Sequence, residues 1–209
     1  MTNAPETSFL AGDTVASNPG RLSPNLLRFA LAFPRWPMIW MGALLTSLSL
    51  MVAVHWAFAI LAAILLVGNG FYWYAIYSGF RYGCVNPAVV VSREDRLIAV
   101  FTDLTTGRGD YPVIKVLHHP LSLMSSVDPR VGTRLATIAT YRGDDEERHW
   151  RDFHPHAVNC VTTDGSEIRR VLQSIPAEDW DSLQRGLQQV PRPFKPGLYF
   201  VDPQEQTNW

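Results

Sequence analysis

A chain of 209 residues has room for one membrane unit and one compact domain, judged against about 100 to 200 residues per domain. Its 19 acidic and 18 basic side chains leave a formal net charge of −1, which argues against a nucleic-acid partner. The two cysteines, Cys84 and Cys160, are too few for a disulfide framework.

The first 35 residues contain two segments of different character. Residues 1–20 are rich in small and polar types without an apolar period, which predicts a disordered tail. The stretch NLLRFALAF, residues 25–33, is apolar around Arg28 and is followed by Pro34 and Pro37. This pattern predicts either a helix at a membrane interface or the start of the first membrane helix.

No Lys, Arg, Asp or Glu occurs between Arg35 and Arg81. One straight helix of this length would measure about 70 Å, more than twice a hydrocarbon core of about 30 Å. The sequence therefore predicts two crossings, at about 38–54 and 57–77, inside a membrane anchor that spans 21–81.

Aromatic residues mark the predicted ends of both crossings, as interfacial belts do. The predicted interface residues are Trp36, Trp40, His55, Trp56, Trp73 and Tyr77. We expect His55 to be a loop residue that anchors the hairpin, because neither crossing holds an ionisable partner for a proton relay. Asn69, between Gly68 and Gly70, is expected to serve hairpin packing or dimerisation.

Positive charges flank the predicted hairpin and are absent from its turn. Arg21, Arg28 and Arg35 precede it, and Arg81, Arg93 and Arg96 follow it. The positive-inside rule then places both termini and the following domain in the cytoplasm, with the hairpin in the inner membrane. Thiols in that compartment are reduced.

The chain after residue 81 changes to short β-branched runs separated by turn residues. Strands are expected at 87–92, 96–103, 111–119 and 134–142, with a further apolar alternation over 152–162. Helices follow at about 165–173 and 177–190, the second with an apolar stripe that we expect to pack on the sheet.

These elements predict the fold class. It is a membrane α-hairpin of two transmembrane helices, followed over 82–200 by an α+β domain. That domain is expected to be an antiparallel sheet or small barrel with C-terminal helices, before a tail at 201–209.

The segment HWRDFHPHAVNC, residues 149–160, is the candidate for chemistry. In an extended strand, His154, His156 and Cys160 would share one face, and imidazole and thiolate suit zinc. His149 or Asp152 could complete the set. Against a metal site, Pro155 is expected to interrupt the strand, and the spacing matches no standard zinc pattern.

Further ligands for that site could come from His118-His119 on another strand. Cys160 could instead act as a nucleophile beside a histidine, or be an inert core residue. The sequence holds no phosphate-binding GxxxxGK[ST], GxGxxG, GxSxG or HExxH motif. RGD at 108–110 and DDEER at 144–148 are predicted to be turns.

Three phrases carry a resemblance: RLATIATYRG, HWRDFHPHAVNCVT and IPAEDWDSLQRGLQQVPRPFKPGLYF. They resemble an uncharacterised bacterial family, a domain of unknown function in membrane-anchored proteins, over about residues 80–200. The resemblance includes no catalytic motif and implies no activity. The order of elements is also similar to bacterial pleckstrin-homology-like membrane proteins, in which two membrane helices precede a β-barrel capped by a C-terminal helix.

Two functions compete at this stage. The first is a membrane-tethered, non-enzymatic module that binds a protein partner, a lipid headgroup or a second copy of itself and needs no cofactor. The alternative is a membrane-anchored metal-binding enzyme or sensor that uses the 149–160 segment. Transport by the hairpin is a weaker third, since only an oligomer could line a path with so few polar groups.

Overall fold

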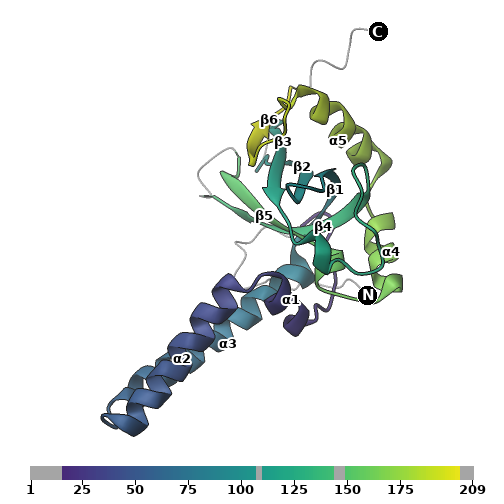
Figure 1. Cartoon of the computed structure of the whole chain (residues 1–209). Helices are drawn as coiled ribbons and strands as arrows, with labels where there is room; N and C mark the ends of the chain where they lie inside the picture. Colours follow the sequence, from purple (N-terminus) through teal and green to yellow (C-terminus); the bar gives the residue numbers. More distant parts are fainter. Residues whose placement is uncertain (1–15, 107–109, 144–148, 203–209) are drawn as a thin grey trace, which may run out of the picture.

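The computed structural model describes residues 16–106, 110–143 and 149–202 (Figure 1). Its helices are α1 (Leu26–Ala32), α2 (Arg35–Ala53), α3 (Phe58–Tyr82), α4 (Gly165–Gln173) and α5 (Ala177–Gln189), with 3-10 turns η1 (Leu121–Leu123) and η2 (Val158–Cys160). Its strands are β1 (Cys84–Ser92), β2 (Leu97–Asp103), β3 (Pro112–His118), β4 (Arg134–Arg142), β5 (Asp152–Ala157) and β6 (Gly197–Phe200). Residues 107–109 and 144–148, which cover most of the predicted RGD turn and all of the DDEER turn, lie outside the described residues.

The α2–α3 hairpin projects away from the sheet (Figure 1). By length and composition, both helices are long and apolar enough to cross a membrane. His55 lies between them, as the sequence predicts. α3 extends to Tyr82 rather than to about residue 77, because its last turn packs on the domain and buries Ser78 and Phe80.

Small and polar residues hold the hairpin together, as expected for helices that pack in a membrane. Ser47 Oγ donates to the carbonyl of Phe58 at 3.1 Å, and the Asn69 amide lies 3.5 Å from Met41 Sδ. A Cβ at Gly68 would lie 2.9 Å from the ring of Trp40. Gly68 therefore allows the close approach of the two helices.

The sheet is a curled antiparallel array in the order β5-β4-β1-β2-β3-β6. Its inner face encloses one apolar core, in which Val90, Ile98 and Phe153 are fully buried. Its outer face shares a second core with the helices, and Trp180 and Leu183 of α5 pack there as predicted. Strand β6 was not predicted, because its four residues follow a proline-rich segment that reads as the end of a helix.

Pro155 does not interrupt β5, which corrects the expectation from sequence. β5 is an edge strand, where a proline can lack its N–H without breaking the sheet. The strand ends at Ala157, and Cys160 lies beyond it in η2, so the alternation that placed Cys160 with His154 and His156 does not reach it.

The N-terminal segment and α1 belong to the domain as well as to the anchor. The Val85 N–H donates to the carbonyl of Asn18 at 2.9 Å, and the Gly20 N–H donates to Gly83 at 3.0 Å. Residues 18–20, predicted as part of a tail, therefore pair with the chain at the start of β1. α1 is a separate helix before α2, and its Phe29 is 3% exposed in the outer core.

The other end of the chain extends the domain in the same way. Val201, which the sequence placed in the C-terminal tail, is buried, and its N–H donates to the carbonyl of Pro112 at 3.1 Å. The remainder of that predicted tail, residues 203–209, lies outside the described residues.

Candidate functional site

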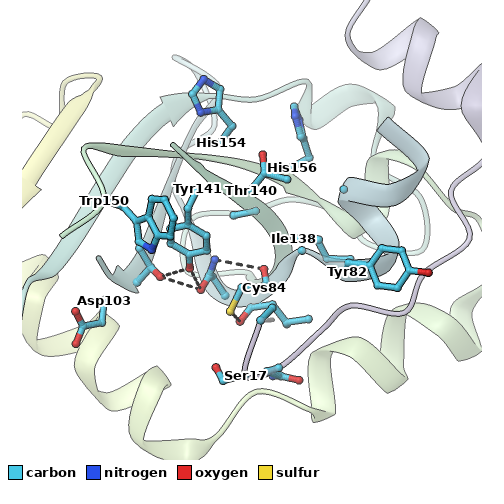
Figure 2. Close-up of a pocket in the computed structure, with 18 of the residues that line it drawn as sticks. Ser17, Tyr82, Cys84, Asp103, Ile138, Thr140, Tyr141, Trp150, His154 and His156 are labelled. Carbon is cyan, nitrogen blue, oxygen red and sulfur yellow. Dashed lines mark hydrogen bonds between the residues drawn. The ribbon is translucent and has the colours of Figure 1, made fainter. Parts of the chain in front are cut away.

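A cavity of about 1210 Å³ lies where α3 meets the sheet, and we call it the junction cavity. Its walls come from the last turns of α3, the start of β1, the ends of β2 and β4, the N-terminal segment 16–18 and the start of α5. Figure 2 shows its labelled lining residues. α3 passes into β1 beside this cavity with only Gly83 between the two elements.

One end of the junction cavity carries a cluster of three polar side chains, Asn86, Thr102 and Tyr141. The Tyr141 hydroxyl and Thr102 Oγ1 are 2.6 Å apart, and Thr102 Oγ1 donates to Asn86 Oδ1 at 3.1 Å. The Tyr141 hydroxyl also lies 3.3 Å from Asn86 Oδ1, so the two hydroxyl protons are shared among three contacts. Each side chain of the cluster thus has a partner within it, and all three belong to the cavity lining.

Burial keeps this end of the cavity uncharged. It raises the pKa of the Tyr141 hydroxyl well above its ordinary value, and it also raises the pKa of the Cys84 thiol nearby. Trp150 lies beside Tyr141, with ring centroids 6.2 Å apart (Figure 2). Neither Tyr141 nor Cys84 is ionised at neutral pH, so neither supplies an activated nucleophile.

The charged side chains of the described lining are mostly acidic. Asp103, Glu178 and Asp179 are present, while Arg142 is the single Lys or Arg among the described lining residues. Burial raises the pKa of Asp179, and the neighbouring Glu178 carboxylate raises it further. The rim of the cavity, where Asp103 and Glu178 are exposed, is therefore more negative than positive.

The end toward the hairpin combines apolar side chains with Ser78, Thr140 and the imidazole of His156. Ala75, Ile76 and Phe80 of α3 line it together with Ile138 of β4. A Cβ at Gly79 would lie 3.3 Å from Thr140 Cγ2, so the helix and the strand are close there without side-chain bulk between them. Apolar groups of the lining are thus concentrated beside α3, while the amide and phenol of Asn86 and Tyr141 lie at the sheet.

His156 lies at the edge of the junction cavity inside an aromatic group. Its ring centroid is 4.6 Å from Phe33, 5.5 Å from Phe29 and 5.9 Å from Phe80. Its Nδ1 is buried and has no hydrogen-bond partner. Burial lowers its pKa to about 4, with a smaller contribution from His154, so the ring is neutral at pH 7.

His119 approaches the same aromatic group from the loop after β3, 5.3 Å from Phe33. It is 3% exposed, and its Nε2 accepts the Ala157 N–H at 3.1 Å. The proton of the neutral ring must then be on Nδ1, which is also buried without a partner. Burial lowers the pKa of His119 to about 3, with His156 as a second cause.

The predicted metal ligands lie in different surroundings. His154 is exposed on the outer face of β5, and partial burial with the nearby Lys115 lowers its pKa. Burial raises the pKa of the Cys160 thiol to about 12, which keeps it protonated and unreactive. Asp152 is bound to Lys115 at 2.6 Å.

The two remaining candidate ligands also have other partners. His149 Nδ1 lies 3.1 Å from the Trp150 carbonyl, and His118 Nδ1 lies 3.0 Å from the Asp95 carbonyl. Within residues 16–106, 110–143 and 149–202, no group of three or more His, Cys, Asp or Glu is placed to hold a metal ion. A zinc site at His154, His156 and Cys160 stays a prediction without geometric support.

The predicted interface residues lie along the hairpin and at its turn. Trp36 and Trp56 are exposed, and the ring of Trp56 lies 5.7 Å from that of His55. Trp40 and Trp73 are partly covered, because Trp40 stacks on Tyr72 and Trp73 meets Phe29 edge-on at 6.5 Å. Their contact with a membrane interface stays a prediction.

Sequence reasoning missed the Asn86, Thr102 and Tyr141 cluster. A signal was present, because Asn86 shares the strand parity of Ala88 and Val90, which face the inner core. A polar residue on the apolar parity of a buried strand indicates a partner across the sheet. That partner could not be identified, since pairing with β2 and β4 is not readable from one chain.

Comparisons with known proteins give a family and one related structure. No curated protein matches the chain. A crystal structure described as that of a "putative membrane protein" from Corynebacterium diphtheriae is similar at 20% identity, with a TM-score of 0.46. The match covers 56% of this chain and 99% of that one.

The family match covers residues 75–191, from the last turns of α3 to the end of α5. It includes most of the described lining of the junction cavity and all strands except β6. The chain therefore belongs to the family described as protein of unknown function, DUF3239.

Proposed function

We propose that the chain is a non-enzymatic binding module, tethered to the cytoplasmic (inner) membrane by the α2–α3 hairpin. Both termini and the β-rich domain lie in the cytoplasm. The ligand is held in the junction cavity or on the domain surface beside it, and its class is a lipid headgroup, a protein partner or a second copy of the chain.

One observation carries the proposal: the hairpin and the domain share a core. Phe80 of α3 is 3% exposed, and its ring lies 6.0 Å from that of Phe29. A Cβ at Gly83 would lie 2.8 Å from the Ala139 carbonyl, so the joint between α3 and β1 is packed against β4. A hairpin fixed in this way holds the domain at a constant height above the bilayer.

The orientation is supported by the arginines near the joint. Arg21, Arg35 and Arg81 are exposed close to the domain end of the hairpin, while the turn at 54–57 contains no charge. Positive residues are retained on the cytoplasmic side, which favours a domain in the cytoplasm.

Binding is favoured over catalysis by the chemistry of the cavity. Its buried thiol and phenol are held in their neutral forms, and its polar cluster is satisfied internally. The chain has two membrane helices, then a curled sheet, then C-terminal helices. This order is similar to that of pleckstrin-homology-like membrane proteins, and we include that likeness in the proposal.

Labelling with a membrane-impermeant maleimide tests the tether and the orientation. Ala57→Cys places a thiol in the exposed turn, and Gln184→Cys places one on the exposed face of α5. We expect intact spheroplasts to be labelled at position 57 only, and position 184 to react after the membrane is permeabilised. The native thiols give little background, because burial raises the pKa of both.

Two results would contradict the proposal. Labelling of position 184 in intact cells would reverse the orientation. Release of the full-length protein from membranes by carbonate washing would remove the tether itself.

A further inference from the structure

We propose that the junction cavity binds an uncharged, hydroxyl-bearing membrane amphiphile, with its hydrocarbon part beside α3 and its head at the Asn86, Thr102 and Tyr141 cluster. Diacylglycerol and a neutral glycosyl-diacylglycerol share this chemistry. The inference rests on the proposed function, because it needs α3 to be in a bilayer.

The position of the cavity gives the first argument. Its apolar wall, Ala75, Ile76 and Phe80, lies on the same helix as the predicted span and begins two residues after Trp73. Trp73 belongs to the predicted interfacial belt. A ligand whose chains stay among the lipids can therefore reach the cavity without leaving the membrane.

The size of the cavity gives the second argument. Pockets for drug-sized ligands measure about 300 to 1,000 Å³. The junction cavity measures about 1210 Å³ and joins an apolar end to a polar one. Such a space suits an amphiphile, which has both a hydrocarbon part and a head, better than a small polar metabolite.

The polar end selects the head. Asn86, Thr102 and Tyr141 present amide and hydroxyl groups, and both members of a hydroxyl pair can exchange donor and acceptor roles. Trp150 beside Tyr141 adds a flat apolar surface against which the C–H face of glycerol or of a sugar can lie. The oxygen lone pairs that the internal hydrogen bonds leave free can accept the proton of a ligand hydroxyl, so such a ligand can be bound without any charge.

Electrostatics argues against a phosphate head. Among the described lining residues Arg142 is the single Lys or Arg, and it is outnumbered by Asp103, Glu178 and Asp179. Asp103 and Glu178 are exposed at the rim and Asp179 is half-buried, so an anionic head would meet three carboxylates and one guanidinium there. An uncharged head avoids that repulsion.

The test uses the full-length protein in phosphatidylcholine nanodiscs. Each preparation contains one of three analogues with a photoactivatable diazirine near the head: diacylglycerol, glycosyl-diacylglycerol or phosphatidylglycerol. Mass spectrometry locates the labelled peptides. We expect the two uncharged analogues to label residues 76–87 or 138–142, and phosphatidylglycerol to label the hairpin surface alone. The stronger of the two uncharged analogues identifies the head.

A pair of glycine variants provides a matched control at the apolar end. Gly79→Leu places side-chain bulk at the close approach of α3 and Thr140 and extends it into the cavity, whereas a Cβ at Gly70, on the same helix, meets nothing within 4 Å. We expect Gly79→Leu to reduce labelling of the cavity by about tenfold, equivalent to 1.4 kcal/mol, and Gly70→Leu to leave it unchanged.

A second pair of variants tests the polar end without changing volume. Tyr141→Phe removes the hydroxyl of the cluster, while Tyr199→Phe removes one that donates to the Lys195 carbonyl elsewhere. We expect the first variant, but not the second, to weaken cavity labelling. Thermal unfolding of each variant shows whether it remains folded, and Tyr141→Phe decides the question if Gly79→Leu does not fold.

The outcomes separate this inference from the proposed function. Labelling of the hairpin without labelling of the cavity would overturn the inference and leave the tether intact. Equal cavity labelling by phosphatidylglycerol would overturn the choice of an uncharged head. Absence of labelling along α2 and α3 would remove the tether, and the inference with it.

Discussion

His119 and His156 are neutral imidazoles at the place where the anchor packs on the sheet. Each has a buried Nδ1 without a hydrogen-bond partner. Protonation of His119 at Nε2 would end its acceptance of the Ala157 N–H, and protonation of either ring would place a charge among phenylalanines. The two rings therefore make the joint sensitive to acid.

The pKa values give the direction and the window of this dependence. Burial lowers the pKa of His156 to about 4 and that of His119 to about 3, against about 6.5 in an unfolded chain. The unfolded chain thus binds more protons between about pH 6.5 and the folded values, so stability falls as the pH falls through that window.

We expect His156→Phe to reduce this loss of stability, because its ring replaces the imidazole among three phenylalanine side chains and cannot be protonated. The measurement is the thermal midpoint in detergent at pH 7 and pH 5. His118→Phe, an exchange at an exposed site, is the control. An equal pH dependence in His156→Phe and the unmodified chain would contradict the assignment.

At the scale of elements, α1 packs between the hairpin and the domain and joins the two, and we call it the clamp. Phe29 and Ala32 face the core, while Leu27 and Leu31 on the other side are 71% and 64% exposed. The Arg28 guanidinium donates to the Leu123 carbonyl at 3.0 Å and holds the helix on η1. The helix is apolar around Arg28, as expected from sequence. Some of its apolar side chains are buried against the domain, while others are exposed on the opposite side.

Phe29→Ala tests the clamp. Removal of a buried phenylalanine side chain costs about 3 to 5 kcal/mol, and here the loss falls on the short helix α1. We expect α1 to detach and limited trypsin digestion to cut faster after Arg28, with the exposed neighbour Leu27→Ala as control. A variant as resistant to trypsin as the unmodified chain would show that α1 is held by other contacts.

At the scale of the whole molecule, the outer core includes residues from both sides of residue 82, where the sequence predicted the boundary between anchor and domain. Leu22, Phe29 and Phe80 belong to the same outer core as Ile138 and Val171. We expect a fragment of residues 82–209 to unfold at a lower temperature than the full chain and to bind hydrophobic dyes. A fragment as stable as the full chain would show that the domain is independent of the anchor.

Local pattern predicted most of the elements but not the candidate site. The absence of charge between Arg35 and Arg81 predicted the hairpin, and β-branched alternation predicted five of the strands. The polar cluster depends on Thr102 and Tyr141 meeting Asn86 across 16 and 55 residues. Such pairing is set by sheet register, which one sequence does not specify.

Structure that depends on distant contacts or on the end of a strand also explains two wrong predictions, the tail at residues 18–20 and the placement of Cys160. Composition alone made residues 18–20 look like a tail, yet their partners are at Gly83, Val85 and the distant Ser174. Cys160 was aligned with His154 and His156 because the strand was assumed to continue, whereas the backbone turns into η2 after Ala157.

The contacts of the N-terminal segment also determine the order in which the protein can be assembled on the ribosome. Asn18 donates to the Ser174 carbonyl and Gly20 accepts from Arg170, so these partners are synthesised about 150 residues later. At about 5 to 20 residues per second, the hairpin is complete well before they appear. Insertion into the bilayer therefore precedes closure of the domain: the leading segment can pair with Gly83 and Val85 early, but its contacts with Arg170 and Ser174 form only when the last helices emerge.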